Sequence, residues 1–331
     1  MSTNDAVTGT QSFGRGSIVS FWRKFAGMDI FFPLVGLVAV CVLMSFATDN
    51  FLSFNNAMNV MRQVSIIGIM AVGMTFVILT GGIDLSVGAV MALGGTITAG
   101  LMVGGLNPSL ALLAGLALGL GFGLFNGTLV AFAGMPSIIV TLATMGIARG
   151  FALIYSGGYP ISGLPGWISW FGAGHIGEIP VPVVVVIMFF VYFVAWVALE
   201  RTPFGRYVYA IGGNEQATRL SGVRVSWIKL AVYGIAGVTT AIAAIVLTGR
   251  LMSGQPNAGI GYELDAIAAV VLGGTAITGG RGSILGTLIG AMLLGIMNNG
   301  LNLMGVDPYV QNVIKGAIIL LAIYVGRDRR V

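Results

Sequence analysis

Residues 181–199 read VPVVVVIMFFVYFVAWVAL, a run that carries no charged side chain and is apolar on every face. A helix that crosses a bilayer needs about 20 mostly apolar residues. A strand of a membrane β-barrel would instead alternate apolar and polar side chains. The run therefore predicts a transmembrane helix over about 182–199, and it indicates an all-α membrane protein.

The composition of the whole chain agrees with lipid as its solvent. The 331 residues are 56% hydrophobic and only 8% charged, whereas about a quarter of a soluble domain is charged. This excludes a large soluble domain and disorder for most of the chain. Cys41 is the single cysteine, which excludes a disulfide scaffold. The net charge of +5 comes without a basic stripe interleaved with aromatics, so nucleic acid is not an expected partner.

Further apolar runs predict about ten transmembrane helices, and eight is the alternative if one pair of glycine-rich runs does not cross. The polar segment 1–29 is expected to be cytoplasmic and partly disordered, with an interfacial anchor at Phe21–Lys24. It precedes a single transmembrane domain over 30–326. The predicted spans are 30–47, 64–80, 87–105, 109–132, 137–155, 182–199, 229–249, 264–279, 284–304 and 310–326.

Basic residues are distributed unequally between the two sides of the predicted bundle. With the amino terminus inside, twelve Lys and Arg residues lie inside and only Arg62 and Arg250 lie outside. Cytoplasmic loops of membrane proteins carry such an excess. We therefore expect an even number of spans and two cytoplasmic termini, the second being the tail 327–331.

The chain also contains an internal repeat. The sequence LGGT occurs at 93–96 and again at 272–275, and similar apolar stretches ending in Leu-Thr precede both at 77–80 and 245–248. Spans two to five (about 64–155) then correspond to spans seven to ten (about 229–326). Because the offset of five spans is odd, the two halves run through the membrane in opposite directions. Such inverted repeats commonly form a transport pathway at their interface.

Residues typical of catalysis are scarce. His175, the only histidine, lies in the predicted outer loop 156–181, so a histidine-based triad or metal site is not expected. The phosphate-binding pattern GxxxxGK[ST] does not occur. The sequence thus predicts no catalysis, no metal and no nucleotide cofactor on this chain.

Polar residues within or near the spans are candidates to line a pathway. The acidic ones lie at predicted span ends, where they either cap a helix or take part in gating. Because few charges lie at mid-membrane, an ion-coupled carrier is the less favoured alternative and a neutral polar solute is the expected cargo. The candidates are Asp84, Ser86, Thr96, Asn126, Thr141, Glu263, Asp265, Asn298, Asn299 and Asn302.

The predicted inner loop 200–228 contains a short helix signal. Pro203 and Gly205 are expected to break the chain, and residues 212–214 to form a turn. Asn214 is a suitable N-cap for a helix over 215–220, which Gly222 can end. Such a helix on the inner face lies on lipid or docks in a groove of a partner.

Several of these stretches together resemble a known family. They are GGIDLSVG at 81–88, YAIGGNE at 209–215 with RLSG at 219–222, YELDAI at 262–267 before LGGT, and NNGLNL at 298–303. The chain from about residue 30 to its end is similar to the permease subunits of bacterial ABC importers for monosaccharides, those of the ribose type in particular. Permeases for branched-chain amino acids share the broader fold but lack the string at 81–88, so they are the less favoured alternative.

The resemblance implies partners and a location. It implies a multi-pass protein of the bacterial inner membrane that pairs with a second permease subunit, expected to be identical. A cytoplasmic ATPase that binds ATP and Mg, and a periplasmic sugar-binding protein, complete the importer. Transport by alternating access is implied, and the sugar stays open among ribose, other pentoses, hexoses and polyols.

The resemblance also implies roles for particular residues. The inner loop corresponds to the helix that couples the permease to the ATPase, and the candidates there are Gly205, Asn214, Glu215, Ala217, Arg219 and Gly222. The wider importer pattern is Glu-Ala-Ala, three residues, then Gly. Here Gln216 replaces the first Ala, and Gly222 comes one residue late. Arg62 and Arg250 either dock the binding protein or anchor lipid headgroups.

Overall fold

The computed structural model describes residues 31–177 and 179–327 of the chain. The predicted amino-terminal segment with its anchor, and the tail beyond Arg327, lie outside the described residues. Four short strands, β1 (Ile161–Ser162), β2 (His175–Ile176), β3 (Ile179–Pro182) and β4 (Ser253–Gly254), and a 3-10 turn η1 (Gly166–Ile168) accompany the helices. The helices are α2 (Phe31–Ala47), α3 (Phe54–Leu79), α4 (Val87–Val103), α5 (Pro108–Ala131), α6 (Ser137–Ser156), α7 (Ser169–Ala173), α8 (Val183–Arg201), α9 (Pro203–Gly213), α10 (Glu215–Leu220), α11 (Val225–Leu251), α12 (Tyr262–Leu272), α13 (Ile284–Leu303) and α14 (Pro308–Arg327).

The long helices confirm an all-α membrane protein. In the described part of the chain six helices are long and apolar enough to cross a bilayer, namely α3, α5, α6, α8, α11 and α13. The apolar helices α2 and α4 are shorter, with 17 residues each. Most predicted spans agree with these helices to within a few residues. Helix α3 begins ten residues earlier than predicted, at Phe54.

The predicted span 264–279 is wrong. Helix α12 ends at Leu272, and the residues from there to α13 are not helical. Gly274, Gly279, Gly280 and Gly282 have positive φ there, a conformation that ends an α-helix. The 11 residues of α12 rise only about 16 Å, about half of a hydrocarbon core. The first repeat is interrupted as well, because residues 80–86 between α3 and α4 are not helical.

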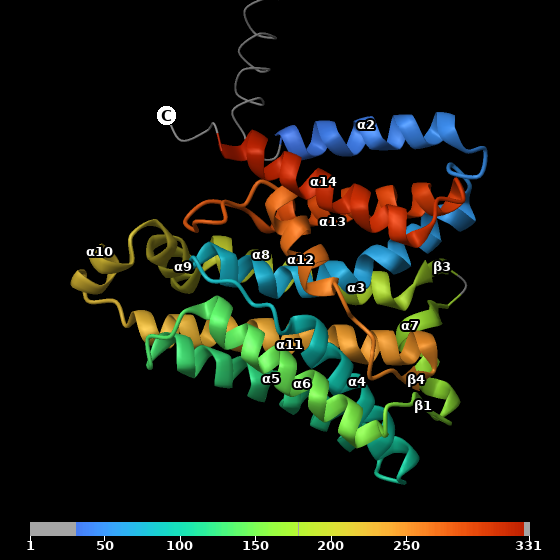
Figure 1. Cartoon of the computed structure of the whole chain (residues 1–331), viewed down its shortest axis with the longest axis horizontal. Helices are drawn as coiled ribbons and strands as arrows, with labels where there is room; N and C mark the ends of the chain where they lie inside the picture. Colours follow the sequence, from blue (N-terminus) through green and yellow to red (C-terminus); the bar gives the residue numbers. More distant parts are fainter. Residues whose placement is uncertain (1–30, 178, 328–331) are drawn as a thin grey trace, which may run out of the picture.

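The packing of the two halves is reciprocal. Helix α11 of the second half packs along α5 and α4, and helix α3 of the first half packs along α13 and α12. Figure 1 shows α3 in the upper group with α12–α14, and α11 in the lower group with α4–α6. The long helices α3 and α11 also contact each other. Each half thus places its first helix against helices of the other half.

Different elements gather at the two ends of the bundle. The start of α2, the end of α14 and the pair α9–α10 lie at one end, on the left of Figure 1. Helix α7 and the strands lie at the opposite end, where β1 pairs with β4. We call these the inner end and the outer end. The predicted outer loop 156–181 is therefore folded, through α7 and the strands.

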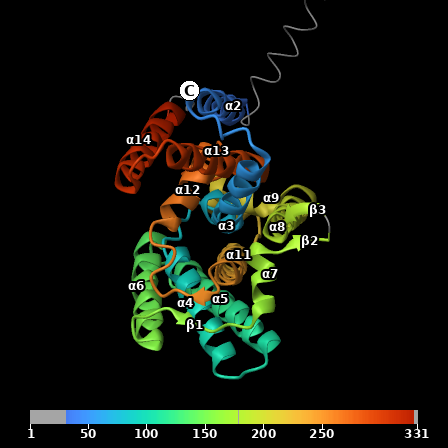
Figure 2. The same cartoon turned by 90° about the vertical axis from the view of Figure 1, so that its right-hand side faces the viewer.

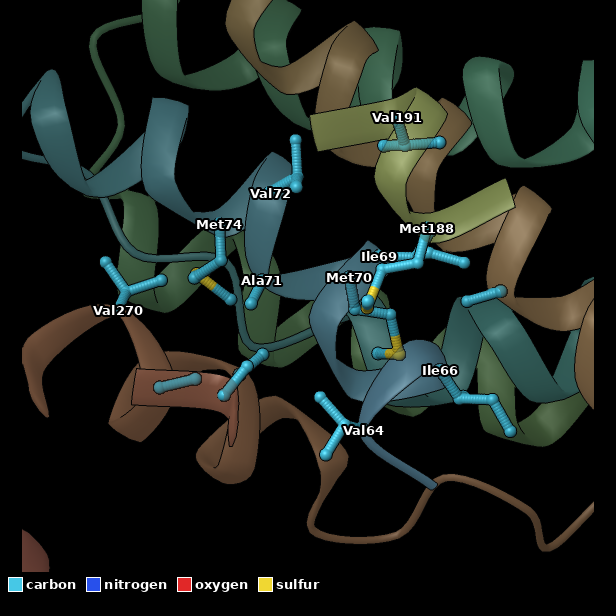
Figure 3. Packing of buried hydrophobic residues seen from close by; sticks show 14 of the residues in the cluster. Val64, Ile66, Ile69, Met70, Ala71, Val72, Met74, Met188, Val191 and Val270 are labelled. Carbon is cyan, nitrogen blue, oxygen red and sulfur yellow. The ribbon is translucent and has the colours of Figure 1, made fainter. Parts of the chain in front are cut away.

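The core is centred on α3. Its residues Val64, Ile69, Met70 and Met74 belong to one buried cluster with Met188 of α8 and Val270 of α12 (Figure 3). Down the long axis, α3 and α11 occupy the middle of the bundle (Figure 2). A Cβ atom on Gly73 of α3 would lie 2.6 Å from the Cα atom of Ala236 on α11. Glycine therefore lets the two central helices approach closely, as small residues do in lipid.

The inner loop contains a helix, α9, that was not predicted from the sequence. The predicted chain break at Pro203 and Gly205 is wrong, because α9 runs through both residues. Pro203 occupies the first turn, where its missing N–H costs nothing, and the hydroxyl of Thr202 accepts a hydrogen bond from the N–H of Gly205 at 3.4 Å. The Thr-Pro pair was the available signal for this helix start.

Candidate functional site

The short helix α10 at the inner end forms as its capping residues predict. The side-chain oxygen of Asn214 accepts a hydrogen bond from the N–H of Ala217 at 2.9 Å, and the helix spans Glu215–Leu220. Gly222 follows with φ +85, which ends the helix. Leu220 is 89% exposed on this helix. An apolar side chain so exposed at the inner end is available to a partner.

Glu215 fixes α10 to the start of α11. Its carboxylate lies 2.6 Å from the ammonium of Lys229 and 3.0 Å from the guanidinium of Arg219. Partial burial alone would raise the pKa of Glu215, but the hydrogen bonds and charges of Lys229 and Arg219 outweigh it and hold that pKa below its ordinary value. Glu215 is therefore ionised at neutral pH and ties the first turn of α10 to the membrane-spanning helix.

Helix α9 connects α10 to the helical bundle. The ring of Phe204 packs against that of Phe76 on α3, with centroids 6.1 Å apart. The hydroxyl of Tyr209 donates a hydrogen bond to the carbonyl of Gly282 at 3.0 Å. Gly205 lies at the α8–α9 corner, where a Cβ atom would overlap the backbone of Leu199. Gly205, a predicted coupling residue, thus allows the close approach of α8 and α9 and lies outside α10.

Three pathway candidates of the first half lie together. The buried carboxylate of Asp84 accepts hydrogen bonds from the N–H and the hydroxyl of Ser86, at 2.9 and 2.6 Å. The amide of Asn126 donates to the same hydroxyl at 2.9 Å. Asp84 therefore stabilises the turn before α4, whose N-cap is Ser86 without a side-chain cap bond. The expectation that Asp84 caps this helix directly is wrong.

Other candidates bond within helices or between them. The hydroxyl of Thr96 donates to the carbonyl of Ala92 in its own helix, and that of Thr141 to the carbonyl of Ser137. Asn299 exchanges two hydrogen bonds of 2.9 Å with Asn56, which joins α13 to α3. The side-chain oxygens of Asn126 and Asn298 have no hydrogen-bond partner within the described part of the chain.

The acidic candidates of the second half have different partners. Glu263 accepts a hydrogen bond from the N–H of Gly261 at 3.2 Å, at the start of α12. Asp265 instead lies 3.4 Å from the ammonium of Lys315 on α14. This pair was not predicted from the sequence, although a lone lysine inside an apolar span was a signal that a partner exists. Asn302 accepts a hydrogen bond from the amide of Gln311 at 2.7 Å, which joins α13 to α14.

A second basic residue within a span also has a defined role. The guanidinium of Arg149 on α6 donates to the carbonyl of Ala258 at 2.9 Å and to that of Pro256. It thereby fastens the segment between α11 and α12 to the first half. In residues 31–177 and 179–327, no group of three or more His, Cys, Asp or Glu is placed to hold a metal ion.

The two basic residues at the outer end differ in their surroundings. The guanidinium of Arg62 lies 2.7 Å from the imidazole of His175 and donates to Asn59 at 3.3 Å. Arg250 is exposed at the end of α11, and its backbone packs against Gly172 of α7. Arg250 is therefore the more accessible of the two to a docking partner.

A groove in the bundle has the wrong chemistry for a sugar. It encloses about 420 Å³ between α3, α5, α8 and α11, and its lining includes Phe76, Leu124, Phe190 and Val194. Of the fifteen residues that line the groove, Thr239 has a side-chain hydroxyl and the others are apolar. A hydroxyl-rich solute needs hydrogen-bond partners when it leaves water. The groove does not meet that need.

Comparison with known proteins places the chain among membrane permeases. A family model described as the permease component of branched-chain amino acid transport systems matches residues 56–323. The ribose import permease protein of Bacillus subtilis (strain 168) is 49% identical over 299 residues, 90% of this chain and 92% of that protein. The corresponding protein of Escherichia coli (strain K12) is 46% identical over 303 residues, 90% and 93% of the two chains. The D-allose transport system permease protein of the same strain is 38% identical over 309 residues, 93% and 92%. No solved structure was found to match.

Proposed function

The chain belongs to the family of permease components of branched-chain amino acid transport systems, and on that premise we propose that it is the membrane permease subunit of an ABC importer for a monosaccharide. The observation that carries the proposal is the similarity to sugar permeases over nine-tenths of both chains. Ribose is the first sugar to test, because the ribose permeases are more similar to this chain than the D-allose permease is. The protein spans the bacterial inner membrane several times.

We expect the ATPase subunit to dock at α10. The helix is exposed at the inner end, yet the pairing of Glu215 with Lys229 holds it against α11. The ATPase would supply the site for ATP and Mg, because this chain has no phosphate-binding loop. Closure of the ATPase would then pull on α9 and α10, and the two repeats would rock between inward and outward openings.

We expect the sugar to pass between two copies of this chain. Helices α6, α12 and α14 lie along one side of the molecule in Figure 2. Both flanking helices expose apolar side chains, such as Ile139 and Phe151 of α6 and Val313 of α14. Helix α12 contacts α14, and its first turn carries the acidic residues Glu263 and Asp265. The carboxylate of Glu263 can accept hydrogen bonds from the hydroxyl groups of a sugar.

We expect the sugar-binding protein to dock at the outer end. Arg250 is exposed there and is a candidate partner for acidic groups of that protein. Affinity and most of the specificity would reside in the binding protein, so the permease needs to bind the sugar only weakly. The polar candidates that bond between helices, such as Asn299, then support the bundle and do not contact the sugar.

The proposal is tested by co-purification and by one charge reversal. Tagged protein solubilised from its native membrane is expected to bring down an ATPase with two nucleotide-binding modules. Glu215→Lys is expected to abolish ATP-dependent uptake of ribose into proteoliposomes. Glu200→Lys, the same change at an exposed position at the end of α8, is the control and is expected to retain uptake. Recovery of the chain alone, with ribose transport that needs no ATP, would make it a secondary carrier.

A further inference from the structure

Three backbone segments meet at the inner end without intervening side chains. They are Leu79–Gly81 at the end of α3, Gly212–Gly213 at the end of α9, and Gly279–Gly280 between α12 and α13. The N–H of Gly280 donates a hydrogen bond to the carbonyl of Leu79 at 3.0 Å. We call these three segments the glycine junction.

The glycine junction is packed at backbone contact. A Cβ atom on Gly279 would lie 2.8 Å from the nitrogen of Gly81 and 3.0 Å from the Cα atom of Gly212. A Cβ atom on Gly280 would lie 2.8 Å from the nitrogen of Gly213. On Gly212 it would overlap the carbonyl of Leu79. Since real side chains do not occupy such spaces, glycine is required at positions 212, 279 and 280.

Each repeat contributes one non-helical segment to the junction. The sequence Thr-Gly-Gly occurs at 80–82, where the interruption before α4 begins, and at 278–280, in the interruption between α12 and α13. Gly81 and Gly279 both have positive φ, at +78 and +86. The junction therefore joins the non-helical segments of both repeats to the end of α9.

The remaining contacts of α9 strengthen the same connection. Phe204 packs on Phe76 of α3, and Tyr209 donates its hydrogen bond to Gly282 in the second interruption. The N-cap of α10, Asn214, follows directly after Gly213. Only one residue, Asn214, separates α10 from the glycine junction. The backbone atoms of the junction are in contact, so a displacement of α10 also displaces the junction.

We propose that the glycine junction transmits the movement of α10 to the interruptions of both repeats at once. The proposal rests on the proposed function, in which an ATPase docks on α10. In this arrangement one coupling segment moves the turn before α4 and the segment between α12 and α13 together. Both halves then change their openings in the same step, as alternating access requires.

The chain offers a matched pair of substitutions for the test. Gly212→Ala places a methyl group into the junction, whereas a Cβ atom on Gly213 meets nothing within 4 Å. Both residues lie in the last turn of α9, where alanine is compatible with the helical backbone. Each variant is reconstituted with its ATPase and binding protein, and ribose uptake and ribose-stimulated ATP hydrolysis are measured.

Gly212→Ala is expected to lose uptake by about tenfold while still co-purifying with the ATPase, because a coupling free energy of this kind is typically worth a factor of this order. Gly213→Ala is expected to stay within about twofold of the native protein, like most surface substitutions. Equal uptake by the two variants would overturn the junction proposal. If no ATPase co-purifies with the native chain, the proposed function is wrong, and the junction proposal, which rests on it, is then wrong as well.

A second measurement tests the junction proposal if the Gly212→Ala variant does not co-purify with the ATPase. Ala210 on α9 and Arg281 in the second interruption are both exposed and flank the bond from Tyr209 to Gly282. Cysteines are placed at both positions in a Cys41→Ala background and joined by a short cleavable cross-linker. Because the two segments move as one unit, the cross-linked protein is expected to keep at least about half of its uptake, a change of the size of a neutral surface substitution. Loss of uptake that cleavage restores would show independent movement and overturn the proposal.

Discussion

The ammonium group of Lys315 on α14 lies 3.4 Å from the carboxylate of Asp265 on the half-length helix α12, and both side chains are less than one-fifth exposed. Both charges are largely shielded from solvent, so each depends on the other for its stability. The pair also joins the shortest apolar helix of the second half to its last helix. It is thus a structural link as well as an electrostatic one.

Removal of one partner is expected to cost more than removal of both. Lys315→Met leaves the Asp265 carboxylate unpaired, which costs about 3 kcal/mol for a buried ion. The double variant Asp265→Asn with Lys315→Met carries no such charge, so its melting temperature in detergent is expected to recover at least half of the loss. Additive losses in the double variant would mean that the two side chains do not interact.

Asn299 is expected to support stability and not sugar affinity. Its two hydrogen bonds to Asn56 are buried between α13 and α3. Asn299→Leu is expected to lower the stability of the bundle by about 1 kcal/mol, the usual worth of such a bond between membrane helices. The maximal rate of ribose uptake at saturating loaded binding protein is expected to stay the same. A lowered rate with an unchanged melting temperature would place Asn299 in the pathway instead.

The sequence was sufficient for features that depend on local chemistry. The span over 182–199 follows from a run that is apolar on every face, and α10 follows from Asn214 and Gly222. The end of α12 was missed because hydropathy does not register backbone angles, although the glycines at 273–282 carried that information. Helix α9 was missed because Pro203 was interpreted as a break and not as a first-turn residue.

The candidate site could be predicted only as a set of residue types. Asp84, Ser86 and Asn126 were all candidates, but their mutual hydrogen bonds depend on how α5 packs against the turn before α4. The pair of Asp265 and Lys315 joins residues 50 positions apart, and the bond from Asn56 to Asn299 joins residues 243 apart. No spacing rule covers such separations, because they are fixed by the packing of whole helices.

Charge reversal at Arg250 is expected to weaken docking of the binding protein in a salt-dependent way. Arg250 is exposed at the outer end, where a repulsive charge acts over about 8 Å at physiological ionic strength. For Arg250→Glu, the half-maximal concentration of loaded binding protein in uptake is expected to rise about tenfold at low salt and to approach the native value as salt is added. Arg281→Glu, at the inner end, is the control and is expected to leave docking unchanged. Equal behaviour at all salt concentrations would remove Arg250 from the docking surface.

The ion pairs of Glu215 make the stability of α10 depend on pH. The folded-state pKa of Glu215 lies below its ordinary value of about 4.3. The stabilising contribution is therefore complete above that value and is lost as the pH falls through the lower, folded-state pKa.

For Glu215→Gln, the backbone amides of α10 are expected to exchange with deuterium about threefold faster than in the native protein at pH 7. The difference is expected to vanish in acid, where the native carboxylate is also neutral. Because both proteins are compared at the same pH, the intrinsic pH dependence of exchange cancels. Glu200→Gln is the control and leaves α10 unaffected, and a difference that grew on acidification would contradict the assignment of these ion pairs.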